Sequence, residues 1–434
     1  MKRFLFGGSV LLFILWLFVQ KPGFFSFETS FFQWRYALII LSGTLALFWM
    51  ATVTALATRP AWLEQRIGGL DRLYAWHKWT GILGTLAALC HWLFEKSPQF
   101  WAPLVQLGAR HGRPPHGQGD LSFLKPMAAH MGELAFYAMV ILVIMALFRW
   151  VPYRIFRLMH KAFPVVFLFA AFHSVVLLPR SAYTQPLGWA VLLMAIWGSV
   201  AALLCLTGRI GRRKRHVSKV SDLQVFGNGT IALEIVRPSG WEPFRSGQFA
   251  LLDFGHGDGF HPFSVVEAST TKLGFAIKPL GDYTRTLANR LRLGDALTVE
   301  GPYGGFVFDE NEAAQVWVAG GIGIAPFLAR LEELAARGKK VEHIDLFYSL
   351  HAPSEEVLSS RIEELCGQVG VRLHKRISSL EGRFRSEEIH AVVRDKGARV
   401  WFCGAADWAP SLKRFLVAQG LAARHFHQEL FEFR

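Results

Sequence analysis

The sequence is poor in charged residues. Asp, Glu, Lys and Arg make up 18% of its 434 residues, whereas soluble proteins average about 25%. Apolar residues instead reach 52%. This balance excludes a disordered chain and argues against an ordinary soluble protein, and it favours a protein with membrane-spanning segments.

Cysteine is also scarce, with four residues and no Cys-x-x-Cys pair. The sequence therefore indicates neither a zinc site nor a disulfide framework. A net charge of +14 would suit a nucleic-acid-binding protein. The basic residues, however, gather beside apolar segments, where they contact anionic lipid. We expect a lipid bilayer as partner and no nucleic acid.

Long apolar runs are confined to residues 1–208, whereas a membrane-spanning helix needs about 20 apolar residues. Candidate spans are Phe4–Val19, Tyr36–Thr58, Leu73–Phe94, Met127–Phe148, Phe156–Leu178 and Pro186–Thr207. We predict a bundle of six transmembrane helices over residues 1–208. The first span resembles a signal peptide in length, but no small-residue cleavage site follows it, so a retained helix is favoured.

Basic residues flank these spans unevenly. Lys2 and Arg3 lie on the same predicted side as the run Arg209–Arg215, which we interpret as a stop-transfer anchor. Because cytoplasmic loops carry the excess of Lys and Arg, we predict a multi-pass protein of the cell (inner) membrane with both termini in the cytoplasm.

Two predicted spans carry paired histidines. His77 and His91 lie 14 residues apart on the third span, which places them within about 40° of each other and about 21 Å apart along a helix. His160 and His173 lie 13 apart on the fifth, about 140° apart unless Pro164 breaks that helix. Imidazole is an axial ligand of haem iron. Pairing His77 with His160, and His91 with His173, would hold two haems; the alternative is hydrogen bonding between helices.

The pattern changes after His216. Short alternating segments predict an antiparallel β-barrel or sandwich over residues 209–309: Thr230–Val236, Gln248–Phe254, Phe263–Glu267, Gly274–Pro279 and Ala296–Glu300. From Gln315, apolar strands alternate with helical stretches, which predicts a parallel α/β domain over residues 310–434. Its expected strands are Val316–Ala319, His343–Tyr348, Val371–Arg376 and Val400–Cys403.

Two stretches of the predicted barrel have the residue types of a flavin site. One is the run His261, Pro262, Phe263 and Ser264, in which Phe263 supplies an aromatic ring, Ser264 a hydroxyl and His261 a hydrogen-bond donor. The other supplies a cation, Lys278, and a turn from Gly281 to Thr284 whose backbone N–H groups suit phosphate. Either stretch alone is also compatible with a plain strand end.

A glycine-rich turn follows the first strand of the α/β domain and precedes a helix. Its residues are Gly320, Gly321, Ile322, Gly323, Ile324, Ala325 and Pro326. Glycine lets the backbone approach a pyrophosphate closely, and a helix N-terminus favours its negative charge. This context predicts a dinucleotide at the carboxyl end of a parallel sheet.

Together these motifs resemble the ferric reductase/NADPH oxidase superfamily, in a compact bacterial form. The resemblance implies a membrane α-helical bundle joined to a ferredoxin-NADP-reductase-like module, an antiparallel barrel that binds FAD and a parallel α/β domain that binds NAD(P)H. It implies two b-type haems with iron bound by His77, His91, His160 and His173. FAD would contact residues 261–264, Lys278, Gly281 and Thr284.

The same resemblance assigns the nicotinamide end of the site. Cys403 and Gly404 would lie near the nicotinamide ring, and Phe431, in preference to Phe433, would be the terminal aromatic that stacks on the flavin. We expect NADPH, with Ser349 and Arg376 nearest a 2′-phosphate, while NADH stays open. The expected activity is electron transfer from NAD(P)H through FAD and haem to an acceptor outside.

Some residues depart from the superfamily pattern. Glu95 stands where dedicated superoxide producers carry a further histidine, which leaves both oxygen and a ferric chelate open as acceptors; Arg35 is the candidate for their outer arginine. No EF-hand extension is present, so we expect activity that is constitutive or limited by nucleotide supply. No obligate protein partner is evident from the sequence. Two alternatives remain: an electron-supply subunit for a quinone or an extracytoplasmic reductase, and a non-redox channel or transporter with a nucleotide-sensing domain.

Overall fold

The computed structural model describes residues 1–20, 24–25, 30–101, 123–148, 151–255, 257, 259–308, 310, 314–393 and 397–429. The chain divides into two units. The first contains Met1–Ile67 and Arg72–Ile210, and the second contains Gly68–Asp71 and the described residues from Gly211 onward. Each is described by itself below.

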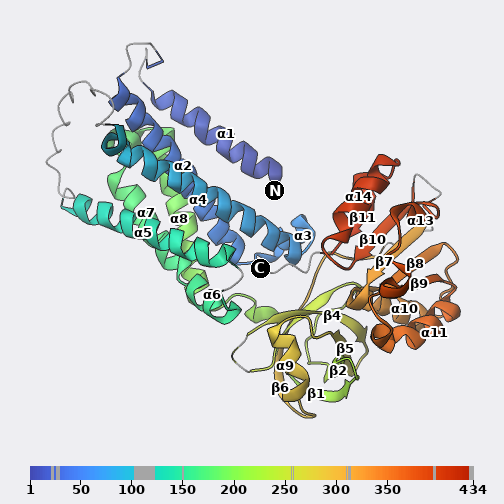
Figure 1. Cartoon of the computed structure of the whole chain (residues 1–434). Coiled ribbons are helices and arrows are strands. Elements are labelled where there is room, and N and C mark those ends of the chain that lie inside the picture. The colour runs from blue at the N-terminus through green and yellow to red at the C-terminus, as the bar shows by residue number, and fades with distance from the viewer. Residues whose placement is uncertain are drawn as a thin grey trace. The chain divides into compact units, whose positions relative to one another are not determined.

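The first unit is helical (Figure 1). Its elements are α1 (Lys2–Val19), α2 (Phe31–Ala57), α3 (Ala61–Ile67), α4 (Leu70–Trp101), α5 (Leu124–Leu147), α6 (Tyr153–His160), α7 (Phe163–Leu177), η1 (Arg180–Thr184) and α8 (Pro186–Leu206). The first two residues of α4 are grouped with the second unit.

Within the described residues, five segments are long and apolar enough to cross a membrane: α1, α2, α5, α8 and Ile155–Leu177. They coincide with five of the expected spans. The remaining expected span lies in α4, which has 32 residues and is not among the five. The polar side chains of α4, His77 and His91 among them, dilute its apolar residues.

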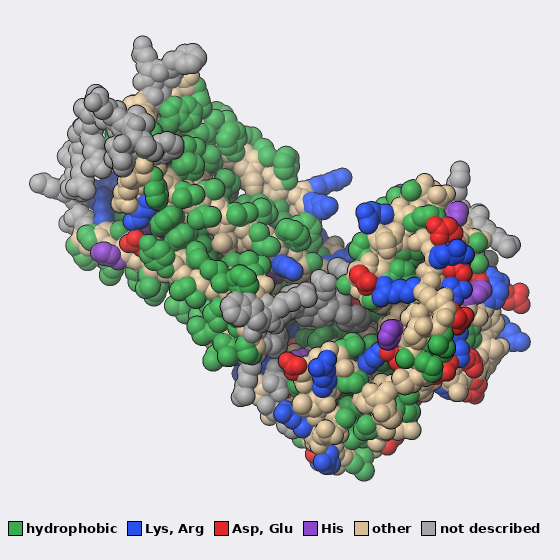
Figure 2. Space-filling view, in the orientation of Figure 1, with side chains coloured by type: hydrophobic (Ala, Val, Ile, Leu, Met, Phe, Trp, Pro, Cys, Tyr) green, Lys and Arg blue, Asp and Glu red, His purple; other side chains and the backbone are tan. Residues whose placement is uncertain are grey.

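Apolar side chains cover the visible face of the helical unit (Figure 2). On α8, Leu193 and Ile196 are 65% and 62% exposed. The core lies between the helices instead, around Ala51, Phe167 and Ala202, each 0% exposed. A helical unit that is apolar on its outer surface as well as inside suits a lipid environment.

The second unit begins with a closed six-stranded barrel in the order β1-β2-β5-β4-β3-β6. A short turn, η2 (Arg212–Lys214), leads into it. Its strands and helix are β1 (Arg215–Val225), β2 (Ile231–Val236), β3 (Phe249–Asp253), β4 (His261–Ala268), β5 (Lys272–Ile277), α9 (Asp282–Arg290) and β6 (Ala296–Tyr303). The neighbouring strands pair antiparallel, and buried side chains such as Ile235, Leu252 and Val299 fill the barrel.

A five-stranded parallel sheet completes this unit, in the order β11-β10-β7-β8-β9. Its strands are β7 (Gln315–Gly320), β8 (Ile344–Leu350), β9 (Arg372–Ile377), β10 (Arg399–Cys403) and β11 (Phe426–Gln428). The helical elements are η3 (Gly321–Ile324), α10 (Ala325–Ala336), η4 (Pro353–Leu358), α11 (Ser359–Val369), α12 (Ser378–Glu381), α13 (Ser386–His390), α14 (Trp408–Ala418) and η5 (Ala423–His425). The expected barrel and parallel sheet are both confirmed; the sequence reasoning missed β1 and β11.

Candidate electron-transfer sites

The four histidines form two facing pairs within the helical unit. The ring centres of His77 and His160 lie 6.0 Å apart, and those of His91 and His173 lie 6.2 Å apart. An iron bound at about 2 Å by two opposed imidazole nitrogens separates the ring centres by about 6 Å. The pairing expected from the sequence is therefore the pairing observed, and the residues fit two iron sites.

Backbone carbonyls hold three of these rings by Nδ1. His77 Nδ1 lies 3.1 Å from the carbonyl oxygen of Val53, and His91 Nδ1 lies 3.0 Å from that of Ile39. His173 Nδ1 lies 2.9 Å from the carbonyl oxygen of Ala128. If each Nδ1–H donates to its carbonyl, Nε2 keeps a free lone pair for a metal.

The His160 ring has a different environment. Its Nδ1 is buried and has no hydrogen-bond partner among the described residues, and the rings of Phe156 and Phe163 flank the His160 ring at 5.1 and 5.0 Å between centres. A buried polar atom in this state calls for a specific explanation, of which a redox role is one. The two facing pairs are thus held differently.

The expected helix break is present between His160 and His173. Helix α6 ends at His160, Lys161 follows as its cap, and α7 begins at Phe163 with Pro164 in its first turn. The 13-residue spacing no longer has to fit one continuous helix, so both rings can face α4.

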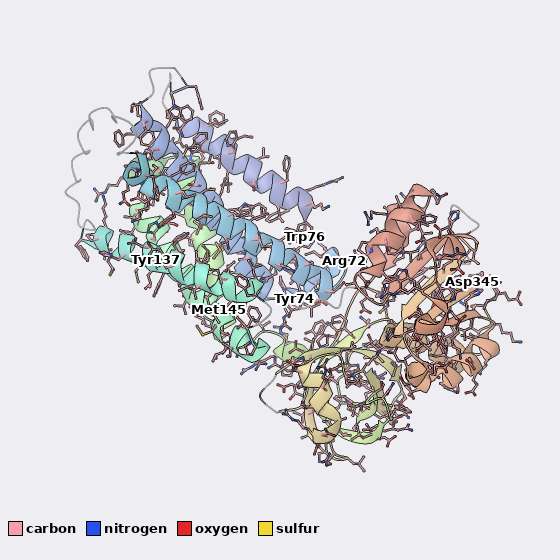
Figure 3. The ribbon with its side chains drawn as sticks, in the orientation of Figure 1. Arg72, Tyr74, Trp76, Tyr137, Met145 and Asp345 are labelled. Atoms are coloured by element: carbon pink, nitrogen blue, oxygen red, sulfur yellow. The ribbon has the colours of Figure 1, made fainter. Side chains whose placement is uncertain are left out.

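Charged residues gather near His91 of α4. Arg35 of α2 forms a 2.7 Å ion pair with Glu95 and donates to the carbonyl oxygens of Phe94 and Glu95 at 2.9 and 2.6 Å. Lys96 pairs with Glu133 of α5 at 3.1 Å. The Tyr137 hydroxyl donates to the same carboxylate, 3.4 Å away, and Figure 3 shows Tyr137 on α5. The charge of Arg35 is therefore balanced by Glu95.

The two flavin stretches meet in the barrel unit. The His261 ring stacks on Tyr283 with 3.8 Å between centres and planes 11° apart, which joins β4 to the start of α9. Phe263 and Ser264 are 9% and 7% exposed, and Phe263 packs in the barrel core. The Thr284 hydroxyl oxygen accepts from the N–H groups of Leu280 and Gly281, each at 3.0 Å, and so fixes the turn before α9.

The glycine turn lies where β7 and β10 approach each other. A Cβ on Gly320 would lie 3.3 Å from the Cα of Gly404, and one on Gly323 would collide with the carbonyl of Cys403. Gly321 has φ +52°, a conformation that favours glycine. Ile324, Ala325 and Pro326 are buried as α10 begins. The expected glycines thus keep the backbone open at the carboxyl end of the sheet.

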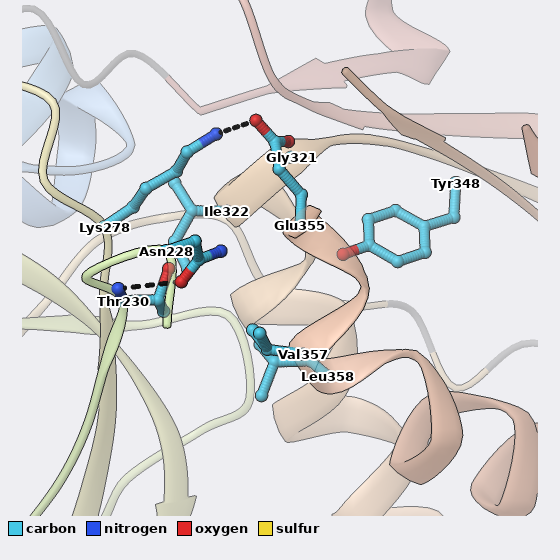
Figure 4. A pocket seen from close by; sticks show the side chains of 9 residues that line it. All are labelled: Asn228, Thr230, Lys278, Gly321, Ile322, Tyr348, Glu355, Val357 and Leu358. Carbon is cyan, nitrogen blue, oxygen red and sulfur yellow. Dashed lines mark hydrogen bonds and ion pairs between the residues drawn. The ribbon is translucent and has the colours of Figure 1, made fainter. Parts of the chain in front are cut away.

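A cleft between the barrel and the parallel sheet leads to this turn (Figure 4). Its lining residues are Asn228, Thr230, Lys278, Gly321, Ile322, Tyr348, Glu355, Val357 and Leu358. Lys278 Nζ lies 2.6 Å from Glu355 Oε1 and 3.7 Å from the place of a Cβ on Gly321. The structure therefore brings Lys278, expected at FAD, beside the glycine turn.

Glu355 is charged in this cleft. Burial alone would raise the pKa of Glu355. The hydrogen bonds from the Lys278 ammonium and the His351 N–H, together with the charges of the two side chains, outweigh burial and lower this pKa. The side chain is 14% exposed, and the His351 N–H donates to Oε2 at 3.2 Å. The carboxylate is thus fixed from two sides.

Glu429 is a site residue that sequence reasoning missed. The Cys403 thiol donates to Glu429 Oε2 at 3.9 Å, and Glu429 follows β11, the neighbour of β10. Burial first, and then the Asp71 carboxylate, raise the pKa of Glu429 well above its ordinary value. A lone Glu without a motif gave no sequence signal. Phe431 and Phe433 lie outside the described residues.

The two groups expected near a 2′-phosphate lie in register on adjacent strands. Ser349 of β8 pairs with Gly320 of β7 on one side and Arg376 of β9 on the other. Ser349 is 7% exposed. Arg376 forms two hydrogen bonds to Glu388, at 3.1 and 2.9 Å, and its guanidinium lies over the Phe384 ring.

Comparisons with known proteins agree with these two units. Residues 42–171 match the family described as "Ferric reductase like transmembrane component", and residues 215–306 match a family described as "FAD-binding domain". The two domains together match the ferric reductase/NADPH oxidase superfamily. The first match contains His77, His91 and His160 and ends two residues before His173.

Curated relatives include electron transfer components of dioxygenases. The chain is 32% identical over 150 residues to the "Heme-dependent oxidative N-demethylase beta subunit" of Ectopseudomonas mendocina, covering 34% of this chain and 45% of that protein. It is 24% identical over 200 residues to the "Anthranilate 1,2-dioxygenase electron transfer component" of Acinetobacter baylyi, covering 43% and 58%. The chain thus spans about half the length of these relatives.

Among solved structures, the flavohemoglobin from Malassezia yamatoensis with bound FAD and heme has a TM-score of 0.51 and 17% identity. The alignment covers 92% of this chain and 98% of that protein. At this identity the likeness concerns the fold alone. On the two family matches, the chain is an oxidoreductase-type flavoprotein with a membrane domain.

Proposed function

We propose that the chain carries electrons across a membrane, from NAD(P)H through FAD and two b-type haems to an acceptor on the outer side. The two facing imidazole pairs carry this proposal, because their ring separations of 6.0 and 6.2 Å fit an iron between each pair. The proposed domains are residues 1–208 for the haems, 209–309 for FAD and 310–434 for NAD(P)H, with both termini cytoplasmic.

The chain's own residues divide the work. His77 with His160, and His91 with His173, hold iron at two depths, and the Val53, Ile39 and Ala128 carbonyls orient three of these rings. A flavin, when bound, accepts a hydride and releases single electrons. The barrel residues around His261 and Thr284 position it, and the glycine turn after β7 binds the dinucleotide.

Cys403 and Glu429 shape the nicotinamide end of the site. Both side chains are buried, so they exclude water from the place where a hydride moves. Their hydrogen bond directs the thiol proton at a carboxyl group whose pKa is raised by burial, which disfavours the ionised form of Glu429. The pair therefore disfavours negative charge beside the hydride donor.

The acceptor is oxygen or a ferric chelate. Because each histidine pair would supply two ligands to an iron, the acceptor would not need to bind the metal itself. Arg35 is the candidate outer-side cation, and its ion pair with Glu95 weakens its attraction for anions.

The first experiment reduces the purified protein with NADH or NADPH without oxygen while the haem absorption bands are followed. We expect two haems per flavin, reduced in turn and reoxidised by air with superoxide formation or by a ferric chelate. Reduced haem that neither acceptor reoxidises favours an electron-supply subunit. A purified chain that binds no haem contradicts the proposal and favours a channel or transporter.

Ligand variants test the assignment. His91→Leu should lose one haem and keep a reducible one, whereas His77→Leu should keep one haem that NAD(P)H no longer reduces. His130→Leu is the matched control, because His130 is an exposed histidine of α5. Two haems retained in His91→Leu would contradict the pairing.

A further inference from the structure

We propose that the chain selects NADH over NADPH and that Glu355 is the residue responsible. This inference rests on the proposed function, because it concerns the adenosine end of the same dinucleotide site. It reverses the preference expected from Ser349 and Arg376.

The order of the parallel sheet gives the direction in which the dinucleotide lies. Read from the other edge, the strands run β9-β8-β7-β10-β11, so the chain reverses direction across the sheet between β7 and β10. A dinucleotide binds at such a point with its pyrophosphate on the turn after the first strand. Cys403 ends β10, on the nicotinamide side, so the adenosine ribose extends toward the end of β8.

Glu355 lies on that path. It follows β8 in η4, and its Oε2 lies 3.6 Å from the place of a Cβ on Gly321, within the pyrophosphate turn. The same oxygen accepts the N–H of His351, the residue directly after β8. Figure 4 shows the carboxylate beside Gly321 and directed toward Lys278.

A carboxylate at this place distinguishes the two coenzymes by charge. It accepts hydrogen bonds from the ribose hydroxyls of NADH, whereas a 2′-phosphate would bring up to two further negative charges beside it. Lys278 offsets part of the Glu355 charge, because its Nζ lies 2.6 Å from Glu355 Oε1 and 3.7 Å from the place of a Cβ on Gly321. We therefore expect a preference for NADH rather than an exclusion of NADPH.

The nearby cations are already engaged by acids. Arg376, on the next strand, is held by Glu388 through both terminal nitrogens. Lys375 pairs with Glu356 at 2.8 Å and with Glu363 at 2.6 Å. A 2′-phosphate would have to displace a carboxylate to gain either cation.

Binding of two fragments that lack nicotinamide tests the proposal without redox chemistry. ADP-ribose and 2′-phospho-ADP-ribose are titrated calorimetrically into the full-length, flavin-loaded protein. We expect ADP-ribose to bind about tenfold more tightly, and haem reduction by NADH to exceed that by NADPH in kcat/KM by a similar factor.

Three variants assign the effect to Glu355. Glu355→Gln should remove most of the preference, and Glu355→Asp, which keeps the charge, should retain it. Glu364→Gln is the control, because it removes the same charge from α11, where Glu364 pairs with Arg361 outside the cleft. Flavin and haem content verify that each variant folds.

The outcomes separate this inference from the function on which it rests. Tighter binding of 2′-phospho-ADP-ribose by the wild type, or an unchanged ratio in Glu355→Gln, overturns the inference even if both coenzymes reduce the haems. Failure of both NADH and NADPH to reduce the flavin overturns the proposed function instead.

Discussion

The Cys403 thiol donates a hydrogen bond to the Glu429 carboxyl across 3.9 Å, and both side chains are at most 5% exposed. They come from neighbouring positions at one end of the parallel sheet, because β10 ends at Cys403 and β11 ends just before Glu429. Burial first, and then the Asp71 charge, raise the pKa of this carboxyl group and so disfavour its ionised form.

Replacing Glu429 by Gln should change how stability depends on pH. The folded wild type keeps a proton that the unfolded carboxyl releases above its ordinary pKa of 4.5. Stability is therefore lost as pH rises from there toward the raised pKa, by up to about 1.4 kcal/mol per pH unit. Thermal unfolding followed by flavin fluorescence should show Glu429→Gln gaining on the wild type as the pH rises above 4.5. Exposed Glu387→Gln is the control, and parallel curves would contradict the prediction.

Gly132→Ala should remove the haem held by His91 and His173. A Cβ on Gly132 of α5 would collide with the His173 ring. Haem content per flavin should fall by about half. Gly81→Ala is the matched control, because its Cβ would make only an ordinary 3.6 Å contact with Val53. Full haem content in Gly132→Ala would show that the ring can move without losing iron.

Lys278→Met should weaken the binding of both coenzymes. Lys278 lies beside the pyrophosphate turn, so we expect KM to rise about tenfold for NADH and NADPH with flavin content unchanged. Lys272→Met is the control, because Lys272 begins β5, the strand that Lys278 follows, but pairs with Glu234 of β2. Loss of flavin from Lys278→Met would instead place this lysine at FAD, as the sequence led us to expect.

Glu95→Gln should change the preference for charged acceptors. Without the carboxylate, the Arg35 guanidinium is uncompensated. The reduction rate should rise about two- to fivefold for anionic ferricyanide and fall for cationic hexaammineruthenium(III). The rates of His91→Leu are subtracted to remove direct transfer from flavin. High salt should abolish the difference, and equal changes for both acceptors would contradict it.

The sequence predicted the histidine pairs because helical spacing and depth follow directly from residue number. It also predicted the break between α6 and α7, because Pro164 lies between His160 and His173 and proline interrupts a helix. The four expected strands of the parallel sheet were found because each is a short apolar run between helical stretches.

Other features depend on tertiary contacts that no local pattern records. Strand β1 begins within the basic run interpreted as a membrane anchor, since Arg215 pairs there with the buried Glu300. The sequence offered Arg376 as a partner for phosphate, whereas in the structure Arg376 forms an ion pair with Glu388. Glu429 gains its unusual environment only when β11 joins the sheet beside β10.

The break after His160 separates two proposed iron ligands that belong to one predicted membrane span. In one continuous helix, their 13-residue spacing would fix the two imidazoles about 140° apart. The turn at Lys161 and Ala162 removes this constraint, so each imidazole takes its direction from its own helix. A substitution within α7 can therefore reorient His173, and with it the proposed site shared with His91, while His160 keeps its place.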